Sequence, residues 1–233
     1  MKVVMINGQN HKGSSYNIGR LLVDEISGEK EVKEFFLPRD LNHFCVGCYS
    51  CIKDETKCPY YEEKNRIMKE IEQADLLVFT TPTYCMAPSA PMKAFIDLTF
   101  SYWLSHKPRE CMFSKKAVVI STAAGVGTKD AIKPVARTLS YWGISNVKKY
   151  GVSVQAMNWE MVSQNKKEKI QKKIKKLANS LSKKSGNTVS LKTKFMFWFF
   201  AGMQKSDMGS GPEERQYWIE KGWLGKKRPW KKK

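Results

Sequence analysis

The sequence lacks any apolar run long enough to cross a bilayer. Its most apolar window, residues 195–202, is far shorter than the ~18 apolar residues that a spanning helix needs. The opening apolar stretch is interrupted at Asn7, so it does not match the long apolar core of a secretory leader. We therefore expect a cytoplasmic protein without a transmembrane segment.

Several chemical signatures are also missing. The chain contains neither the Gly-x-Gly-x-x-Gly spacing of dinucleotide-binding folds nor the Gly-Lys-Ser/Thr of P-loops. Its three histidines, His11, His43 and His106, are scattered, and no paired carboxylate or Cys–His arrangement accompanies them. The sequence therefore assigns no side chain as a catalytic acid, base or nucleophile and leaves the catalytic residues unknown.

Acidic residues are scarce. The chain has 22 Asp and Glu against 41 Lys and Arg, which gives a net charge of +19. Lysines concentrate in residues 166–194 and 226–233. This pattern fits a solvated basic face, an acidic partner, a membrane surface or attraction of anionic substrates and cofactors. No nucleic-acid motif accompanies the charge, so we do not expect nucleic-acid binding.

Apolar runs that read as strands alternate with segments of helical periodicity. The predicted strands are 3–6, 31–37, 75–80, 116–121 and 147–154, and the predicted helices are 18–26, 64–73, 92–104, 130–142 and 160–181. Continuous apolar strands in βαβ order indicate a parallel sheet covered on both faces. We predict an α/β fold, a flavodoxin-like doubly wound sandwich with a five-stranded parallel sheet, over residues 1–185.

Three loops should meet at the carboxyl edge of this sheet, where such folds bind ligands. They are 8–15, 81–90 and 122–127, and all are rich in Gly, Ser, Thr, Pro or Ala. The first leads into a helix N-terminus, whose free N–H groups and hydroxyls can hold a phosphate. Ser14, Ser15 and Asn17 are equally ordinary capping residues. The convergence of the three loops favours a mononucleotide site.

Three motifs carry a family resemblance: NGQNHKGSSYN (7–17), ADLLVFTTPTYCMAPSAPMKAFIDLT (74–99) and STAAGVG (121–127). Together they resemble the NAD(P)H-dependent FMN reductase and iron–sulfur flavoprotein group of the flavodoxin-like superfamily, over about residues 1–180. The resemblance implies an FMN-dependent oxidoreductase. Electrons would pass from NAD(P)H through FMN to a small acceptor such as a quinone, nitro compound, free flavin or metal ion.

The resemblance also implies residue roles. The FMN phosphate site would comprise Gln9, His11, Ser14, Ser15 and Asn17. One edge of the ribityl chain and ring would follow Pro82, Thr83, Tyr84, Cys85 and Met86, and the other edge would follow Thr122, Ala123, Ala124 and Gly125. The chain departs from the family at Gln9-Asn10, where members often carry Ser followed by Arg or Pro, and His11 stands in an often basic slot.

Four of the six cysteines form a C-x2-C-x2-C-x6-C pattern followed by proline: Cys45, Cys48, Cys51 and Cys58. Such thiolates can hold a [4Fe–4S] cluster, and zinc also suits the ligand type. A disulfide framework is not expected without a secretion signal. In the resembling group, both cluster-bearing flavoproteins and plain reductases carry such a loop. An iron–sulfur electron carrier is therefore the alternative function.

Residues 186–233 form an aromatic and basic C-terminal extension beyond the predicted domain. Aromatic residues at this density rarely remain in water. We expect the extension to pack on the core or on a partner subunit, and we favour a homodimer with tail exchange or docking. A membrane-surface role and a basic binding module without redox activity are the remaining alternatives.

Overall fold

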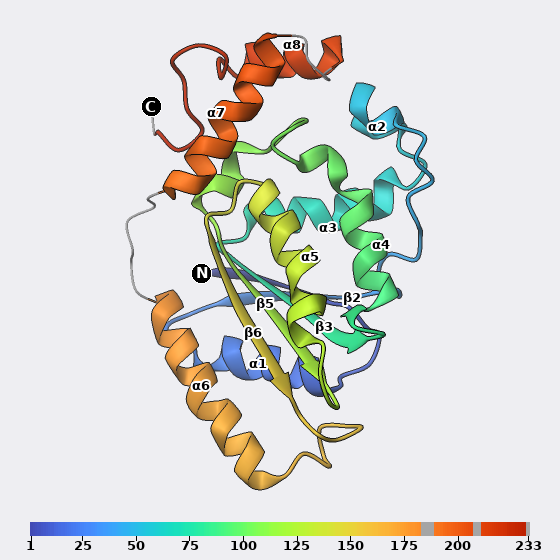
Figure 1. Ribbon diagram of the computed structural model, residues 1–233, viewed down its shortest axis with the longest axis vertical. Coiled ribbons are helices and arrows are strands. Elements are labelled where there is room, and N and C mark those ends of the chain that lie inside the picture. Colours follow the sequence, from blue (N-terminus) through green and yellow to red (C-terminus); the bar gives the residue numbers. More distant parts are fainter. Residues whose placement is uncertain (183–188, 207–210, 232–233) are drawn as a thin grey trace.

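Five parallel strands form the centre of the molecule (Figure 1). The computed structural model describes residues 1–182, 189–206 and 211–231. The sheet order is β2-β1-β3-β5-β6, which confirms the predicted flavodoxin-like topology. The parallel strands are β1 (Lys2–Asn7), β2 (Glu31–Phe36), β3 (Leu76–Tyr84), β5 (Lys116–Ala123) and β6 (Asn146–Ser153), and the short β4 (Ala87–Pro88) pairs antiparallel with β3.

Helices cover both faces of the sheet because the strands are apolar on both sides. On β1, Val3 and Met5 pack with one cluster, whereas Val4 and Ile6 pack with the other. The first cluster lies under α1 (Ser14–Glu25) and α6 (Gln164–Ser182). The second lies under α3 (Tyr61–Gln73), α4 (Ala90–Leu98) and α5 (Thr128–Tyr141).

Some predicted boundaries are wrong. The helix expected over 92–104 ends at Leu98, where the Thr99 hydroxyl donates to the carbonyl of Ile96 at 2.9 Å. Two 3₁₀ turns follow, η2 (Phe100–Tyr102) and η3 (Glu110–Ser114). The helix expected from 160 begins at Gln164. The cysteine loop contains two short elements, α2 (Ser50–Lys53) and η1 (Glu55–Lys57).

The C-terminal extension adds two helices, α7 (Leu191–Lys205) and α8 (Pro212–Glu220). Phe197 of α7 packs with Trp218 and Trp223, and this cluster includes Leu104 and Phe113 of the α/β domain. Both of these domain residues precede β5, so the extension lies at the amino end of the sheet, away from the strand arrowheads (Figure 1). Across the described ranges, α7 included, none of the helices has the length and apolar character that a bilayer crossing requires.

Candidate functional site

A pocket of about 260 Å³ opens at the carboxyl ends of the strands. We call it the edge pocket. All three predicted loops contribute to its wall. The predicted residues that line it are Gln9, His11, Ser14, Ser15, Pro82, Thr83, Tyr84, Thr122, Ala123 and Ala124. The structure thus brings together side chains from β1, β3 and β5 that lie far apart in the sequence.

Four predicted residues lie outside the lining of the edge pocket: Asn17, Cys85, Met86 and Gly125. The Asn17 amide nitrogen donates to the carbonyls of Lys12 (2.8 Å) and Gly13 (3.0 Å), so this side chain holds the first loop in shape. Cys85 and Met86 occupy a turn beside the pocket, and Gly125 is exposed next to Ala124.

The N-terminus of α1 opens on the edge pocket without a side-chain cap. Its N-cap residue is Gly13, and no side chain accepts a hydrogen bond there. The capping interpretation of Ser14, Ser15 and Asn17 is therefore wrong. The first-turn N–H groups, together with the positive end of the helix dipole, remain available to an anion. Ser15 turns its hydroxyl to Thr122, with 2.6 Å between the two oxygens.

Buried polar contacts fix the strand ends at the floor of the edge pocket. Asn7 is 1% exposed; its amide nitrogen donates to the Phe35 carbonyl at 3.1 Å, and its amide oxygen accepts from the Thr80 hydroxyl at 2.8 Å. The N–H of Gly8 donates to the carbonyl of Thr80 at 2.7 Å. A Cβ at Gly8 would lie 2.6 Å from the Ser89 oxygen. Only glycine therefore allows this close approach of the two loops.

A tight hairpin forms one wall. Thr83 and Tyr84 pair with Pro88 and Ala87, which leaves Cys85 and Met86 as the two turn residues. Their φ angles are 48° and 60°, the left-handed conformation of a type I′ turn, which usually contains Asn or Gly. The predicted loop over 81–90 is thus wrong at its start, because β3 continues through Pro82 to Tyr84.

The far wall contains residues that the sequence reasoning missed. Val154, Ala156 and Met157 follow β6, and the Val154 N–H donates to the Ala123 carbonyl at 2.9 Å. The loop after the fifth parallel strand must reach the same edge of the sheet as the other three loops. The parallel topology is therefore the signal that predicts these three residues. The other missed lining residues are Asn7, Gly13, Tyr16 and Thr80.

The cysteine loop forms a second, smaller pocket. Cys45, Cys48, Cys51 and Cys58 all line it, together with Leu98 and Phe100 among others. Hydrogen bonds from Ser50 lower the pKa of the Cys48 thiol. Burial raises the pKa of the Cys51 thiol, although the charge of Lys64 opposes this rise. Over the ranges that the structure describes, no three or more His, Cys, Asp or Glu side chains are arranged to hold a metal ion.

A group of charged side chains surrounds the buried Lys64, next to the cysteine loop. Lys64 is fully buried, and its Nζ is 3.4 Å from Glu55 Oε1. Arg109 pairs with the other oxygen of Glu55, and its Nε is 3.3 Å from Glu72 Oε1. Burial raises the pKa of Tyr102, whose ring lies beside Arg109 and Lys64. These contacts attach the cysteine loop to α3 and to the segment before β5.

Comparison with known proteins agrees with this architecture. Residues 1–158 match the family described as NADPH-dependent FMN reductase. Since the match covers well over half of the sequence, the chain belongs to the NADPH-dependent FMN reductase family.

Individual relatives are more distant. An iron–sulfur flavoprotein of Archaeoglobus fulgidus is 26% identical over 147 residues, which are 62% of this chain and 64% of that protein. An FMN-dependent NADH:quinone oxidoreductase of Pelagibacter ubique is 22% identical over 182 residues, 69% of this chain and 93% of that protein. The chain matches between 51% and 64% of the length of two archaeal iron–sulfur flavoproteins.

Solved structures show the same fold. The crystal structure of an FMN-dependent NADH-azoreductase from Bacillus anthracis, in complex with FMN, superposes with a TM-score of 0.56 at 15% identity. The superposition covers 78% of this chain and all of the azoreductase chain.

Proposed function

We propose that the chain is an FMN-dependent oxidoreductase that takes electrons from NADH or NADPH and passes them to a small acceptor. Candidate acceptors are a quinone, a nitro compound, a free flavin and a metal ion. The observation that carries the proposal is the uncapped N-terminus of α1, which opens on a pocket walled by hydroxyls and small side chains. A basic binding module without redox activity would not need this arrangement.

The lining of the edge pocket suits the parts of FMN. The first-turn N–H groups of α1 and the Ser14 hydroxyl would hold the phosphate, with Gln9 and His11 closing the loop around it. Ala123 and Ala124 on one wall, and Pro82 and the neighbouring hairpin on the other, leave room for a flat ring. FMN, when bound, supplies the hydride and electron chemistry.

The remaining predicted contacts lie around the mouth of the edge pocket. Asn17 would act by shaping the phosphate loop, because its amide holds the carbonyls of Lys12 and Gly13. Cys85, Met86 and Gly125 lie next to lining residues of the two walls, so they would meet the edges of the cofactor rather than its centre. The net charge of +19 would attract anionic nicotinamide cofactors from solution.

The mouth of the edge pocket is unusually apolar for a surface. Tyr84, Met86, Val126 and Met157 are 47%, 52%, 76% and 87% exposed. A second copy of the chain would cover this surface, so we propose a homo-oligomer, with a homodimer as the simplest form. We also propose that the protein is cytoplasmic. Light scattering of the purified protein tests the assembly, and Val126→Glu should weaken it.

Purified protein tests the flavin proposal. It should contain one FMN per chain, and NADH or NADPH should bleach the flavin under anaerobic conditions. Ser14→Ala should weaken FMN binding about 10- to 100-fold, since a hydrogen bond to a charged group contributes ~1.5–3 kcal/mol. Ser114→Ala, which removes an exposed hydroxyl on η3, is the matched control. A colourless protein that does not bind added FMN would refute the proposal.

An iron–sulfur electron carrier is the second candidate function, because four cysteines line one pocket. Cys45, Cys48, Cys51 and Cys58 would hold a [4Fe–4S] cluster, and their exposed members would have to turn inward, since no three are arranged for an ion here. An anaerobic visible absorption spectrum, together with iron analysis, distinguishes this candidate from the FMN-dependent reductase. Bound iron that is lost in Cys48→Ala but kept in Cys111→Ala supports this candidate, whereas an iron-free FMN spectrum excludes it.

A further inference from the structure

The helix α7 exposes an aromatic stripe, which we define as Leu191, Phe195, Trp198 and Phe199. These side chains are 81%, 67%, 51% and 57% exposed. Their spacing places them on one face of the helix. The opposite face, with Phe197 and Ala201, is buried against the rest of the extension. The packing of the extension on the core therefore leaves the aromatic stripe uncovered.

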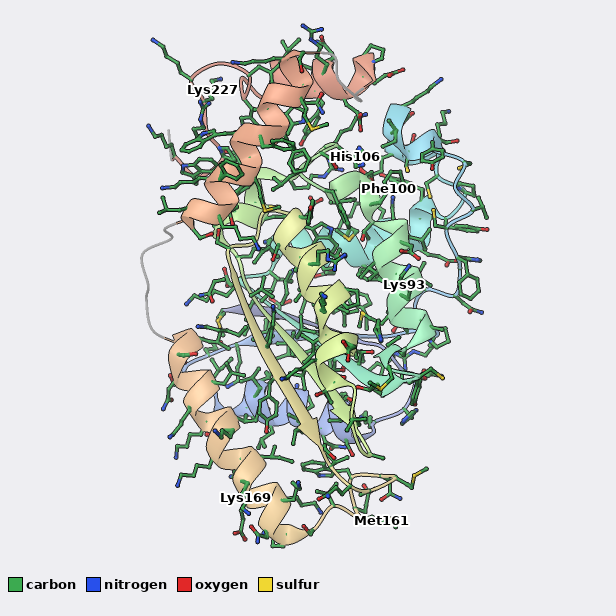
Figure 2. The ribbon with its side chains drawn as sticks, in the orientation of Figure 1. Lys93, Phe100, His106, Met161, Lys169 and Lys227 are labelled. Carbon is green, nitrogen blue, oxygen red and sulfur yellow. The ribbon has the colours of Figure 1, made fainter. Side chains whose placement is uncertain are left out.

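The extension also carries many cationic side chains. Lys192 and Lys205 are exposed on α7. Beyond α8, a basic pocket is lined by five cationic side chains, Lys221, Lys226, Lys227, Arg228 and Lys231, and by two acidic ones, Glu110 and Glu220. Its floor includes Trp223, whose ring centroid is 5.7 Å from that of Phe197. Lys227 and α7 lie at the same end of the molecule (Figure 2).

The positive charge of the extension indicates which kind of partner can bind there. A second copy that met the aromatic stripe with its own stripe would bring its Lys192 and Lys205 against those of the first copy, and like charges across an interface oppose association. An anionic partner has the complementary sign. The four stripe side chains are exposed along one face of a helix, an arrangement that suits a flat surface. Exposed Trp and Phe beside Lys are the composition of helices that lie at the headgroup boundary of a bilayer.

We propose that the extension docks on membranes that carry anionic lipid headgroups. The aromatic stripe enters the headgroup boundary, and the basic pocket at the same end of the molecule binds phosphate-bearing headgroups. The contact is peripheral, because no helix described in the structure can span a bilayer. It is independent of the flavin proposal, since the extension and the edge pocket lie at opposite ends of the sheet.

Vesicle co-sedimentation of the full-length protein tests the stripe. The protein should bind vesicles of phosphatidylcholine with phosphatidylglycerol at least about tenfold more tightly than vesicles of phosphatidylcholine alone. Phe195→Glu should weaken this binding about tenfold or more. Met161→Glu is the matched control: Phe195 and Met161 are 67% and 66% exposed, both changes add one negative charge, and Met161 lies at the other end of the molecule (Figure 2).

A second pair of variants tests the basic pocket. Lys226→Gln/Lys227→Gln should weaken binding to the anionic vesicles severalfold. Lys169→Gln/Lys173→Gln removes the same charge from α6 and should weaken it much less. Equal losses in the two variants would show attraction by net charge alone and would overturn the proposal.

Two further results would also overturn it. One is equal binding to the two vesicle types, or none to either. The other is a dimer that Phe195→Glu dissociates without any vesicle binding by the original chain, which would make the stripe a contact between copies. Circular dichroism of each variant verifies folding. Brominated lipid should quench the tryptophan fluorescence of the bound protein, and the part of this quenching that is lost in Trp198→Phe reports insertion of the stripe.

Discussion

The hydroxyl oxygens of Ser15 and Thr122 lie 2.6 Å apart, although 107 residues separate them in the chain. Ser15 belongs to the first turn of α1 and Thr122 to the end of β5. Both side chains are buried. This contact therefore sets the position of the uncapped helix terminus relative to the opposite wall of the edge pocket.

Removing one of these two hydroxyls should lower the unfolding free energy by more than the net contribution of the hydrogen bond between them. We expect Thr122→Val to lower the unfolding free energy of the FMN-free protein by about 1–2 kcal/mol, because it leaves the Ser15 hydroxyl buried without this partner. The double variant Ser15→Ala/Thr122→Val should cost less than the sum of the single changes. Urea unfolding of all four proteins measures the coupling. Strictly additive losses would contradict the assigned contact.

Gly125 allows cofactor binding to be separated from folding. A Cβ at this position would meet no atom within 4 Å in the free protein, so Gly125→Val should change the unfolding free energy by less than about 0.5 kcal/mol. The same side chain should raise the Kd for FMN about tenfold if the ring edge approaches here. Gly202→Val on α7 also points into open space and should leave FMN binding unchanged. Unaltered titrations for both variants would remove Gly125 from the site.

The turn at Cys85 and Met86 stores backbone strain. Left-handed conformations cost an ordinary residue about 1–2 kcal/mol, and Asn tolerates them better. Cys85→Asn should therefore raise the unfolding free energy by about 0.5–1 kcal/mol, whereas Cys85→Ser should give no gain. Urea denaturation compares the two variants. If Cys85→Ser raised the unfolding free energy as much as Cys85→Asn, the gain would come from loss of the thiol and not from relief of strain in the turn.

The ion pair between Glu55 and the buried Lys64 should respond unequally to removal of each partner. Glu55→Gln leaves Lys64 buried and unpaired, and we expect a loss of about 3 kcal/mol in unfolding free energy. Lys64→Met should cost less than about 1 kcal/mol, because Glu55 keeps its contact with Arg109. Denaturation midpoints and slopes measure both effects. Similar losses of unfolding free energy in the two variants would show that Lys64 does not need Glu55 as a partner.

Asp40 should make stability sensitive to acid. Burial raises the pKa of this carboxyl, but the Phe36 N–H, Arg39 and Arg66 together bring the pKa below its usual value. A lowered pKa in the folded state stabilises the protein above the unfolded pKa of ~3.9, and this stabilisation is lost as the pH falls toward the folded value. Between pH 7 and about pH 3, Asp40→Asn should thus lose less unfolding free energy than the original chain. Parallel losses in the two proteins would contradict this role.

The sheet could be predicted from the sequence because its three central strands, β1, β3 and β5, contain continuous apolar runs. Val3 to Ile6 supply both faces, so periodicity and topology agree. The edge pocket followed from the same reasoning, since the carboxyl ends of β1, β3 and β5 must share one edge.

Other features depend on contacts that no local pattern encodes. The hairpin at Cys85 and Met86 uses a left-handed turn without Asn or Gly, the residues that usually signal one. Lys64 occupies a helix face that reads as solvated, yet Glu55 and the ring of Tyr102 enclose it. The sequence likewise does not indicate that the extension packs against Leu104 and Phe113.

The packing of α6 and of the extension has a consequence for dividing the chain into fragments. The family match ends at residue 158, but Ile170, Ile174 and Leu181 of α6 cover one face of the sheet, and Phe197 and Trp218 cover Leu104 and Phe113. A fragment cut at the end of the match would expose these apolar surfaces to water. The segment that matches the family and the unit that folds on its own therefore have different lengths, and expression of residues 1–158 alone should yield aggregated protein.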